Sequence, residues 1–288
     1  MTLNSTSTIV VTGASSGIGR ATALDLARSE HHVYAAARRE RELRTLADTH
    51  PGISALPLDV TDPDSVAAAQ DRVHLETGGR GPDVLVNAAG VAALGPVEAT
   101  PVGQVRRQFE VNVLGALAVT QSFLPAMRAR RAGRVVNISS ALGRFTLPGT
   151  GAYAATKYAL EAISDALRLE LAPFGIAVVL VEPGITATAL FETATTASLD
   201  YTGTKAEYQQ LFSGGPGLSA KVTRASIPAE NVAKTIARAA TAPRPRARYV
   251  PGARNSFNIN LLTNAPTRAV DRIKTRLMEL NTNAVAEQ

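Results

Sequence analysis

Residues 12–19 read Thr-Gly-Ala-Ser-Ser-Gly-Ile-Gly, directly after the apolar run Thr8–Thr12 and at the start of a helical pattern. A glycine-rich turn between a strand and a helix is typical of dinucleotide sites, because the N–H groups and the dipole at a helix N-terminus favour phosphates. In such a turn, Gly13 permits the tight bend, Gly17 lets the backbone approach the phosphates and Gly19 lets the helix pack closely. We therefore expect a phosphate loop made of Gly13, Ser15, Ser16, Gly17, Ile18 and Gly19.

Short apolar runs alternate with helical patterns along the rest of the chain. The expected strands are Thr8–Thr12, Val33–Ala37, Ile53–Leu58, Asp83–Asn87, Arg134–Ser139, Ile176–Glu182 and Arg248–Val250. The expected helices are Ile18–Ser29, Arg39–Thr49, Asp64–Glu76, Val102–Arg130 with a kink at Pro125, Tyr153–Ala172 and Pro228–Ala240. Apolar strands separated by helices indicate a parallel sheet covered on both faces, which is a doubly wound, Rossmann-like α/β fold.

The chain reads as a single domain over residues 1–288. Regular patterning stops between residues 187 and 227, where Thr, Ser, Gly and Ala are frequent, and we interpret this stretch as a substrate lid. A surface loop without function is the alternative. Residues 251–288 read as a C-terminal helical extension that packs on the core of the sheet through four apolar residues at helical spacing: Val270, Ile273, Leu277 and Leu280.

Composition narrows the classes of function. The chain has no cysteine, which excludes disulfides and thiolate metal sites, and we expect no metal. No signal peptide or membrane-spanning run is visible, so a cytoplasmic location is expected. The net charge of +6 divides into −2 over residues 1–220 (18 basic, 20 acidic) and +8 from Lys221 onward (12 basic, 4 acidic). Without an aromatic-basic motif this predicts a solvated basic surface and no nucleic-acid binding. The basic charge of the last quarter of the chain is also compatible with peripheral membrane contact.

The end of the second strand favours NADP over NAD. No carboxylate stands there to hold a ribose 2′-hydroxyl, whereas Arg38 and, as second candidate, Arg39 are suited to a 2′-phosphate. Solvated arginines at a helix start are the alternative. Asp59 follows the third strand and is a candidate for bonding the adenine amino group. The end of the fourth strand offers small residues against which a nucleoside can lie flat: Asn87, Ala88, Ala89 and Gly90.

Residues 13–17 also fit the nucleophile elbow of hydrolases, G-x-S-x-G. That interpretation needs a histidine late in the chain, after the serine and an acid. The four histidines, at 31, 32, 50 and 74, all precede the expected fourth strand. The hydrolase hypothesis is therefore disfavoured.

Tyr153 and Lys157 stand four residues apart, which places them on one face of a helix. A free phenol has a pKa of about 10, and an ammonium about 4 Å away stabilises the phenolate by up to roughly three pKa units. The pair suits proton exchange with a carbonyl or an alcohol. Ser139 and Ser140 end the fifth strand nearby, where either hydroxyl can polarise a carbonyl. Asn112 lies in the preceding long helix and can hold a water near Lys157.

Taken together, these motifs resemble the short-chain dehydrogenase/reductase family in its compact single-domain branch. The glycine loop, Asp59-Val60, NAAG at 87–90, Asn112, Ser140, YAATK and Pro183-Gly184 occur in the family's order over about residues 8–190. The resemblance implies a tetrad of Asn112, Ser140, Tyr153 and Lys157, with Ser140 preferred to Ser139 because it precedes Tyr153 by 13 residues. It also implies that Lys157 bonds the nicotinamide ribose, and that Pro183, Gly184, Ile185 and Thr188 hold the carboxamide.

Shorter stretches resemble the subgroup of 17β-hydroxysteroid and retinol dehydrogenases, which implies a lipophilic alcohol or ketone. Candidate pocket residues are Phe145, Leu147, Phe191, Tyr201, Tyr208, Leu211 and Phe212. The expected activity is hydride transfer between NADP(H) and a secondary alcohol/ketone pair or an aldehyde. A non-catalytic NADP-binding sensor or scaffold is the alternative. The resemblance also implies a homodimer or a homotetramer.

Overall fold

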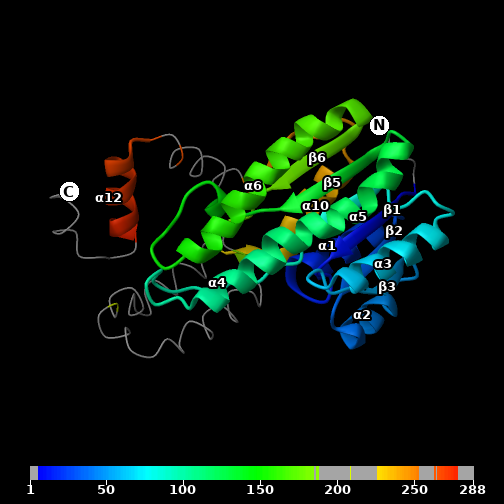
Figure 1. Cartoon of the computed structure of the whole chain (residues 1–288), viewed down its shortest axis with the longest axis horizontal. Coiled ribbons are helices and arrows are strands. Elements are labelled where there is room, and N and C mark those ends of the chain that lie inside the picture. The colour runs from blue at the N-terminus through cyan, green and yellow to red at the C-terminus, as the bar shows by residue number, and fades with distance from the viewer. Residues whose placement is uncertain are drawn as a thin grey trace.

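The computed structural model describes residues 6–184, 186–187, 208, 226–252, 263 and 265–277. Its centre is a parallel sheet in the order β3-β2-β1-β4-β5-β6-β9 (Figure 1). The strands are β1 (Thr8–Thr12), β2 (His32–Ala37), β3 (Ile53–Pro57), β4 (Val84–Asn87), β5 (Gly133–Ile138), β6 (Ile176–Val181) and β9 (Arg248–Tyr249). The strand order reverses between β1 and β4, which confirms the doubly wound α/β fold.

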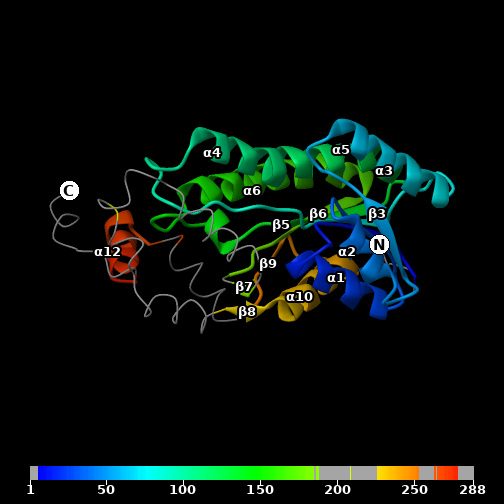
Figure 2. The same cartoon turned by 90° about the horizontal axis from the view of Figure 1, so that it is seen from below.

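Helices cover both faces of the sheet (Figure 2). One face carries α1 (Gly17–Arg28), α2 (Glu40–Ala47) and α10 (Ala229–Thr241), and the other carries α3 (Pro63–Glu76), α5 (Ala116–Ala129) and α6 (Gly151–Leu171). Helix α4 (Val102–Phe109) precedes α5 and also contacts α6.

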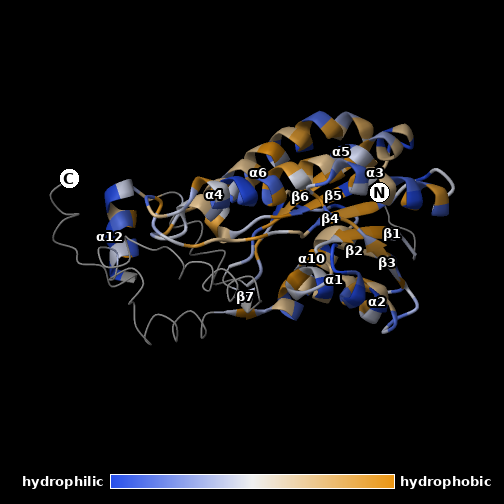
Figure 3. Cartoon of the chain, turned by 60° about the horizontal axis from the view of Figure 1, so that its bottom comes forward, coloured by the Kyte–Doolittle hydropathy of each residue, from blue (hydrophilic) through white to orange (hydrophobic). Residues whose placement is uncertain are grey.

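The strands feed two separate cores because successive side chains point to opposite faces. In β1, Ile9 and Val11 belong to the core under α1 and α10, whereas Val10 belongs to the core under α3 and α5. Figure 3 shows the strands as predominantly hydrophobic and the helices as mixed, with polar residues toward the outside. Burial on both faces explains why the strands read as continuous apolar runs.

The expected strands and helices lie within two residues of the observed ends, but the long helix differs in its interior. It is interrupted by a π-helical turn, Glu110–Gly115, while Pro125 lies inside α5. Gly115 packs closely against the loop after β3, because a Cβ on it would lie 2.7 Å from Val60 Cγ2. Asn112 lies within this turn and is buried.

The expectation that the C-terminal tail packs on the sheet core is wrong for α12 (Thr267–Leu277). This helix lies beyond the end of the sheet in Figures 1 and 2, and Val270, although buried, is not part of either sheet core. Ile273 is 44% exposed. Four side chains of this helix are basic and favour contact with water, so only a narrow stripe of it is apolar and suited to packing. Leu280 lies outside the described residues.

Most of the expected lid lies outside the described residues, but its two ends are described. β7 (Thr186–Ala187) pairs in parallel with β8 (Ile227–Pro228), with Thr186 opposite Ile227. This pairing brings the two ends of the intervening segment together. In the described part of the chain, no helix has the length and apolar character needed to cross a bilayer.

Candidate active site

The carboxyl ends of the strands surround a cavity of about 400 Å³. It lies at the reversal of strand order, where β1 and β4 diverge and open α/β sheets bind their ligands. Its walls come from the loops after β1 to β6: Gly13, Ser15–Gly19, Ala37–Arg39, Leu58–Val60, Ala88–Ala92, Ser139, Ser140, Pro183, Gly184 and Thr186, with Val111, Ile138, Tyr153 and Lys157. Loops distant in sequence thus form one continuous site.

The glycine loop packs tightly against the end of β4. Gly13 has a φ of +70°, and a Cβ on it would lie 2.8 Å from the Ala88 carbonyl oxygen. A Cβ on Gly19 would lie only 2.4 Å from the Gly13 carbonyl oxygen. The turn therefore requires glycine at both positions, and it leaves the N-terminus of α1, which has no acidic residue in its first turn, facing the cavity.

Two arginines stand beside the glycine loop in different settings. The Arg39 guanidinium donates to Ser15 Oγ at 2.9 Å and to Ser16 Oγ at 2.8 Å. Arg38 is 54% exposed, with its Nη1 3.9 Å from Asp59 Oδ2. Burial would raise the pKa of Asp59, but hydrogen bonds from Thr61 and the charge of Arg38 outweigh it and hold that pKa below its usual value.

Asn87 and Asn112 do not line the cavity. Asn87 donates to Thr120 Oγ1 at 2.9 Å and to Asn137 Oδ1 at 2.8 Å, so its side chain joins buried groups between β4, β5 and α5. Of the four residues expected to form a flat wall for a nucleoside, Ala88, Ala89 and Gly90 line the cavity and Asn87 does not.

Asn112 connects two elements that flank the cavity. Its side chain exchanges hydrogen bonds with the Val91 backbone at 2.8 and 2.9 Å and donates to Thr156 Oγ1 at 3.1 Å. Thr156 adjoins Lys157 on α6. Asn112 thus ties the loop after β4 to the helix that carries the expected catalytic pair.

Tyr153 and Lys157 are both buried on one face of α6 and both line the cavity. Lys157 Nζ lies 5.7 Å from the centre of the Tyr153 ring and donates to the Ile138 carbonyl at 2.9 Å. This carbonyl ends β5 and fixes the direction of the lysine side chain. The four-residue spacing read in the sequence therefore becomes a close pair inside the site.

Burial dominates the protonation of this pair. It raises the pKa of Tyr153 to about 12, although a hydrogen bond with Ser140 opposes the shift. It lowers the pKa of Lys157 to about 8, and the negative charge of Glu161 opposes that shift. In this structure the loss of hydration, and no charge of Lys157, accounts for the raised pKa of Tyr153. The lowering expected from Lys157 stays a prediction.

Ser140 and Ser139 face different neighbours. Ser140 caps the 3₁₀ turn Ala141–Gly143, where its hydroxyl accepts from the Leu142 N–H at 3.1 Å, and it also bonds Tyr153. The Ser139 side chain instead lies against Gly143, on which a Cβ would be 2.7 Å from Ser139 Oγ. The contact with Tyr153 favours Ser140 as the serine that meets a substrate.

The wall beside Tyr153 is apolar. Tyr153 and Ala154 form a small cluster with Leu142, against which Ala92, Leu94, Phe145 and Leu147 pack. Of the expected pocket residues, Phe145 and Leu147 thus lie near Tyr153. The Tyr208 hydroxyl donates to Glu98 and does not line the cavity. Phe191, Tyr201, Leu211 and Phe212 lie outside the described residues, as do Ile185 and Thr188.

Sequence reasoning missed Thr186, whose position on the cavity wall had no motif to indicate it. It also assigned no role to a partly buried ionic cluster beyond Lys157 on α6, formed by Arg144, Glu161, Asp165, Glu182 and Arg248. One signal was available, since Tyr153, Lys157, Glu161 and Asp165 repeat at four-residue steps. Among the described residues, no group of three or more His, Cys, Asp or Glu side chains is arranged for a metal ion.

Comparison with known proteins agrees with this geometry. The family model described as short chain dehydrogenase matches residues 7–198, well over half of the chain. The chain belongs to this family. Among solved structures, a short-chain dehydrogenase from Streptomyces avermitilis is 31% identical with a TM-score of 0.75, covering 99% of this chain and 98% of that one. The chain is therefore an oxidoreductase of the short-chain dehydrogenase family.

Two curated relatives carry informative names. The NADPH-dependent 3-dehydrocapnine reductase of Ornithobacterium rhinotracheale is 34% identical over 269 residues, which cover 92% of this chain and 94% of the relative. The 3-ketodihydrosphingosine reductase of Bacteroides thetaiotaomicron is 36% identical over 204 residues, covering 71% of this chain and 72% of the relative.

Proposed function

We propose that this short-chain dehydrogenase uses NADP(H) to interconvert a ketone and a secondary alcohol on a lipophilic substrate. The observation that carries the proposal is one cavity that joins the phosphate loop and two arginines at one end to Ser140, Tyr153 and Lys157 at the other. The names of the two relatives, an NADPH-dependent reductase and a 3-keto reductase, support both the cofactor and the ketone.

The residues present fit a dinucleotide phosphate. The glycine cradle brings backbone against backbone, with no room for a Cβ at Gly13 or Gly19. The N-terminus of α1 and the Arg39 guanidinium supply positive potential for the pyrophosphate. Within the described part of the chain, the carboxylate partner of Arg38 is Asp59 at 3.9 Å, and the exposed guanidinium is available for the 2′-phosphate.

The remaining cofactor contacts follow from the cavity wall. Asp59 and Val60 would border the adenine, Ala88 and Gly90 the adjacent ribose, and Lys157 the nicotinamide ribose. Pro183 and Gly184 would border the carboxamide, together with the expected Ile185 and Thr188. When bound, the nicotinamide supplies or accepts the hydride.

The protein residues would handle the proton. Tyr153, with a pKa of about 12, is a neutral phenol at physiological pH and therefore holds the proton that a ketone oxygen needs on reduction. Ser140 would donate a hydrogen bond to the same oxygen and polarise the carbonyl. The Lys157 ammonium would stabilise the tyrosinate left after transfer, and Asn112 would hold the helix turn next to Lys157 through Thr156.

The apolar wall beside Tyr153 supports a lipophilic substrate. Leu142, Phe145 and Leu147 present hydrocarbon to the point at which the carbonyl would sit. Burying an alkyl or ring surface there contributes about 25 cal/mol per Å² of apolar area. A long-chain or polycyclic ketone would gain more from this wall than a small polar one.

The test follows NADPH oxidation with a panel of steroid, retinoid, long-chain and small ketones. Tyr153→Phe should abolish most turnover while NADPH still binds. Tyr158→Phe is the matched control, because Tyr158 lies on the same helix, is 44% exposed and does not line the cavity. Full turnover in Tyr153→Phe would refute the mechanism. Tight NADPH binding with no turnover on any ketone would favour the sensor alternative.

A further inference from the structure

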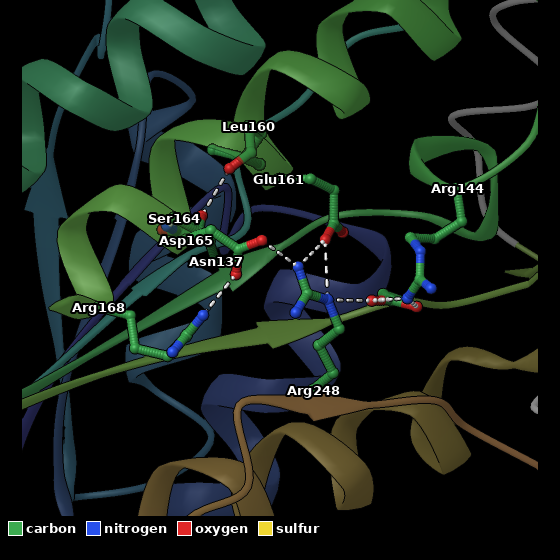
Figure 4. Close-up of polar contacts among 9 residues, drawn as sticks. Asn137, Arg144, Leu160, Glu161, Ser164, Asp165, Arg168 and Arg248 are labelled. Carbon is green, nitrogen blue, oxygen red and sulfur yellow. Dashed lines mark hydrogen bonds and ion pairs between the residues drawn. The ribbon is translucent and has the colours of Figure 1, made fainter.

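The ionic cluster behind the cavity centres on Arg248, which reaches from β9 to α6 (Figure 4). Its guanidinium donates to Glu161 Oε2 at 3.1 and 3.2 Å and to Asp165 Oδ2 at 2.7 Å. Arg248 Nε, which is one of the donors to Glu161, also lies 3.1 Å from Glu182 Oε1, directly after β6. A single cation therefore holds three carboxylates together.

Two of these carboxylates are removed from water. The side chain of Glu161 is 8% exposed and that of Glu182 is 1% exposed. Arg144, just after the 3₁₀ turn, lies 3.3 Å from Glu182 and provides a second cation. Burying charges is costly unless each is paired and hydrogen-bonded, so a cluster of this kind needs explaining.

Glu161 is the member of the cluster that adjoins the catalytic pair. It follows Lys157 by one helical turn, and both side chains converge on Gly143: a Cβ there would lie 3.3 Å from Lys157 Cβ and 3.2 Å from Glu161 Cγ. The Ser139 hydroxyl lies in the same place. Burial raises the pKa of Glu161 and the charge of Glu182 adds to that rise, whereas the hydrogen bond from Ser139 and the Arg248 guanidinium lower it and favour the carboxylate.

We infer that Glu161 is a positioning residue for the reaction: its carboxylate, held by Arg248, keeps the Lys157 side chain in its ammonium form. The inference rests on the proposed function only in that Lys157 then serves the proton transfer. Burial favours a neutral amine at Lys157, and a buried anion one turn away opposes that tendency. The negative charge of Glu161 does raise the pKa of Lys157 against burial.

The other ionisable groups around Lys157 do not replace Glu161. Tyr153, on the same helix, is neutral at physiological pH. Glu182 is bound by both Arg144 and Arg248, and Asp165 lies a further turn away and is bound by Arg168 as well as by Arg248. Arg144 and Arg248 are themselves cations. Glu161 is thus the anion nearest to Lys157 along α6.

The experiment measures the protonation of Lys157 directly, by NMR of protein labelled with ¹³Cε-lysine. The chain has five lysines, and Lys157→Met identifies the signal of Lys157. Unit charges roughly one helical turn apart at an effective dielectric constant of ~20, partly offset by Arg248, predict that Glu161→Gln lowers the titration midpoint of Lys157 by about one pH unit. Gln keeps an acceptor for Arg248, which also remains paired with Asp165 and Glu182.

Glu170→Gln is the matched control, because it removes the same charge from an exposed position on α6 and should leave the midpoint unchanged. An unchanged midpoint in Glu161→Gln, or an equal shift in Glu170→Gln, overturns the inference. If Glu161→Gln does not fold, Glu161→Met removes the charge with an apolar side chain of similar length and leaves Arg248 paired with Asp165 and Glu182. Its midpoint should also fall, and an unchanged value there is equally contrary.

The kinetic measurement separates this inference from the proposed function. With an active ketone, the alkaline limb of kcat/KM in Glu161→Gln should move to lower pH by the same amount as the NMR midpoint. A shifted midpoint without turnover on any ketone would leave the inference standing and refute the proposed function. Turnover whose pH profile ignores the shifted midpoint would refute the role of Glu161 in catalysis.

Discussion

Gly19 offers a sharp test of the phosphate loop, because helix propensity and packing predict opposite effects for its replacement by alanine. Gly19 is the third residue of α1 and has no left-handed φ. Alanine in a helix is favoured over glycine by about 1 kcal/mol. On propensity alone, Gly19→Ala would stabilise the protein.

Packing reverses this expectation. The new Cβ would lie 2.4 Å from the Gly13 carbonyl oxygen and 2.7 Å from the Gly13 carbonyl carbon, and both are backbone atoms. Gly13 has no free space to move into, since its own Cβ position is 2.8 Å from Ala88 and Ala89. Overpacking of this kind costs about 1–3 kcal/mol, so the free energy of unfolding should fall by up to about 2 kcal/mol after the propensity gain is subtracted. We also expect NADPH affinity to fall at least about tenfold, which is about 1.4 kcal/mol.

The assay combines urea unfolding with NADPH fluorescence titration. Gly103→Ala is the matched control: Gly103 lies in the first turn of α4, and a Cβ there meets no atom within 4 Å. The free energy of unfolding of this control should rise by a few tenths to about 1 kcal/mol, and its affinity for NADPH should be unchanged. If Gly19→Ala matches Gly103→Ala in both stability and affinity, the account of the loop is wrong.

Three further changes test other parts of the site and the fold. Arg38→Ala should weaken NADPH binding about tenfold or more and leave NADH binding nearly unchanged, as measured by fluorescence titration; equal weakening would contradict the 2′-phosphate contact. Arg134→Met should lower the free energy of unfolding by about 3 kcal/mol in urea. The reason is that Arg134 donates hydrogen bonds to three carbonyls at the end of α10, those of Ala239, Ala240 and Ala242. Arg244→Met, at an exposed position, should have little effect. Burial lowers the pKa of Lys157 to about 8 in the folded state, below its unfolded value of 10.5. Below pH 8 the folded protein carries the full free-energy cost of a buried ammonium, and this cost decreases as pH rises and Lys157 loses its proton. The stability of the wild type relative to Lys157→Met should therefore rise by on the order of 2 kcal/mol between pH 8 and 10, and a flat difference would show that Lys157 is not buried as an amine.

Local sequence rules predicted the parts of this molecule that depend on neighbours in the chain. The glycine turn, the apolar strands and the Tyr153–Lys157 spacing each follow from a few consecutive residues, and the structure brings the glycine turn, Tyr153 and Lys157 to one cavity. Shared order of these motifs along the chain was also enough to assign the family.

Features that depend on contacts across the fold were not predictable in the same way. The π-helical turn at Glu110–Gly115 reflects contacts of Asn112 and Gly115 with distant loops. Asn87 reads as part of a nucleoside wall, yet its partners come from β5 and α5. The raised pKa of Tyr153 results from burial, which the four-residue spacing does not contain.

Under the proposed use of NADP(H), the different settings of Arg38 and Arg39 determine which of the two positions a change of cofactor preference should target. Arg39 braces Ser15 and Ser16, so replacing it would loosen the turn on which either dinucleotide depends. Arg38 is solvent-exposed, and no part of the loop relies on it. A library directed at NADH should therefore vary position 38 and keep Arg39 constant.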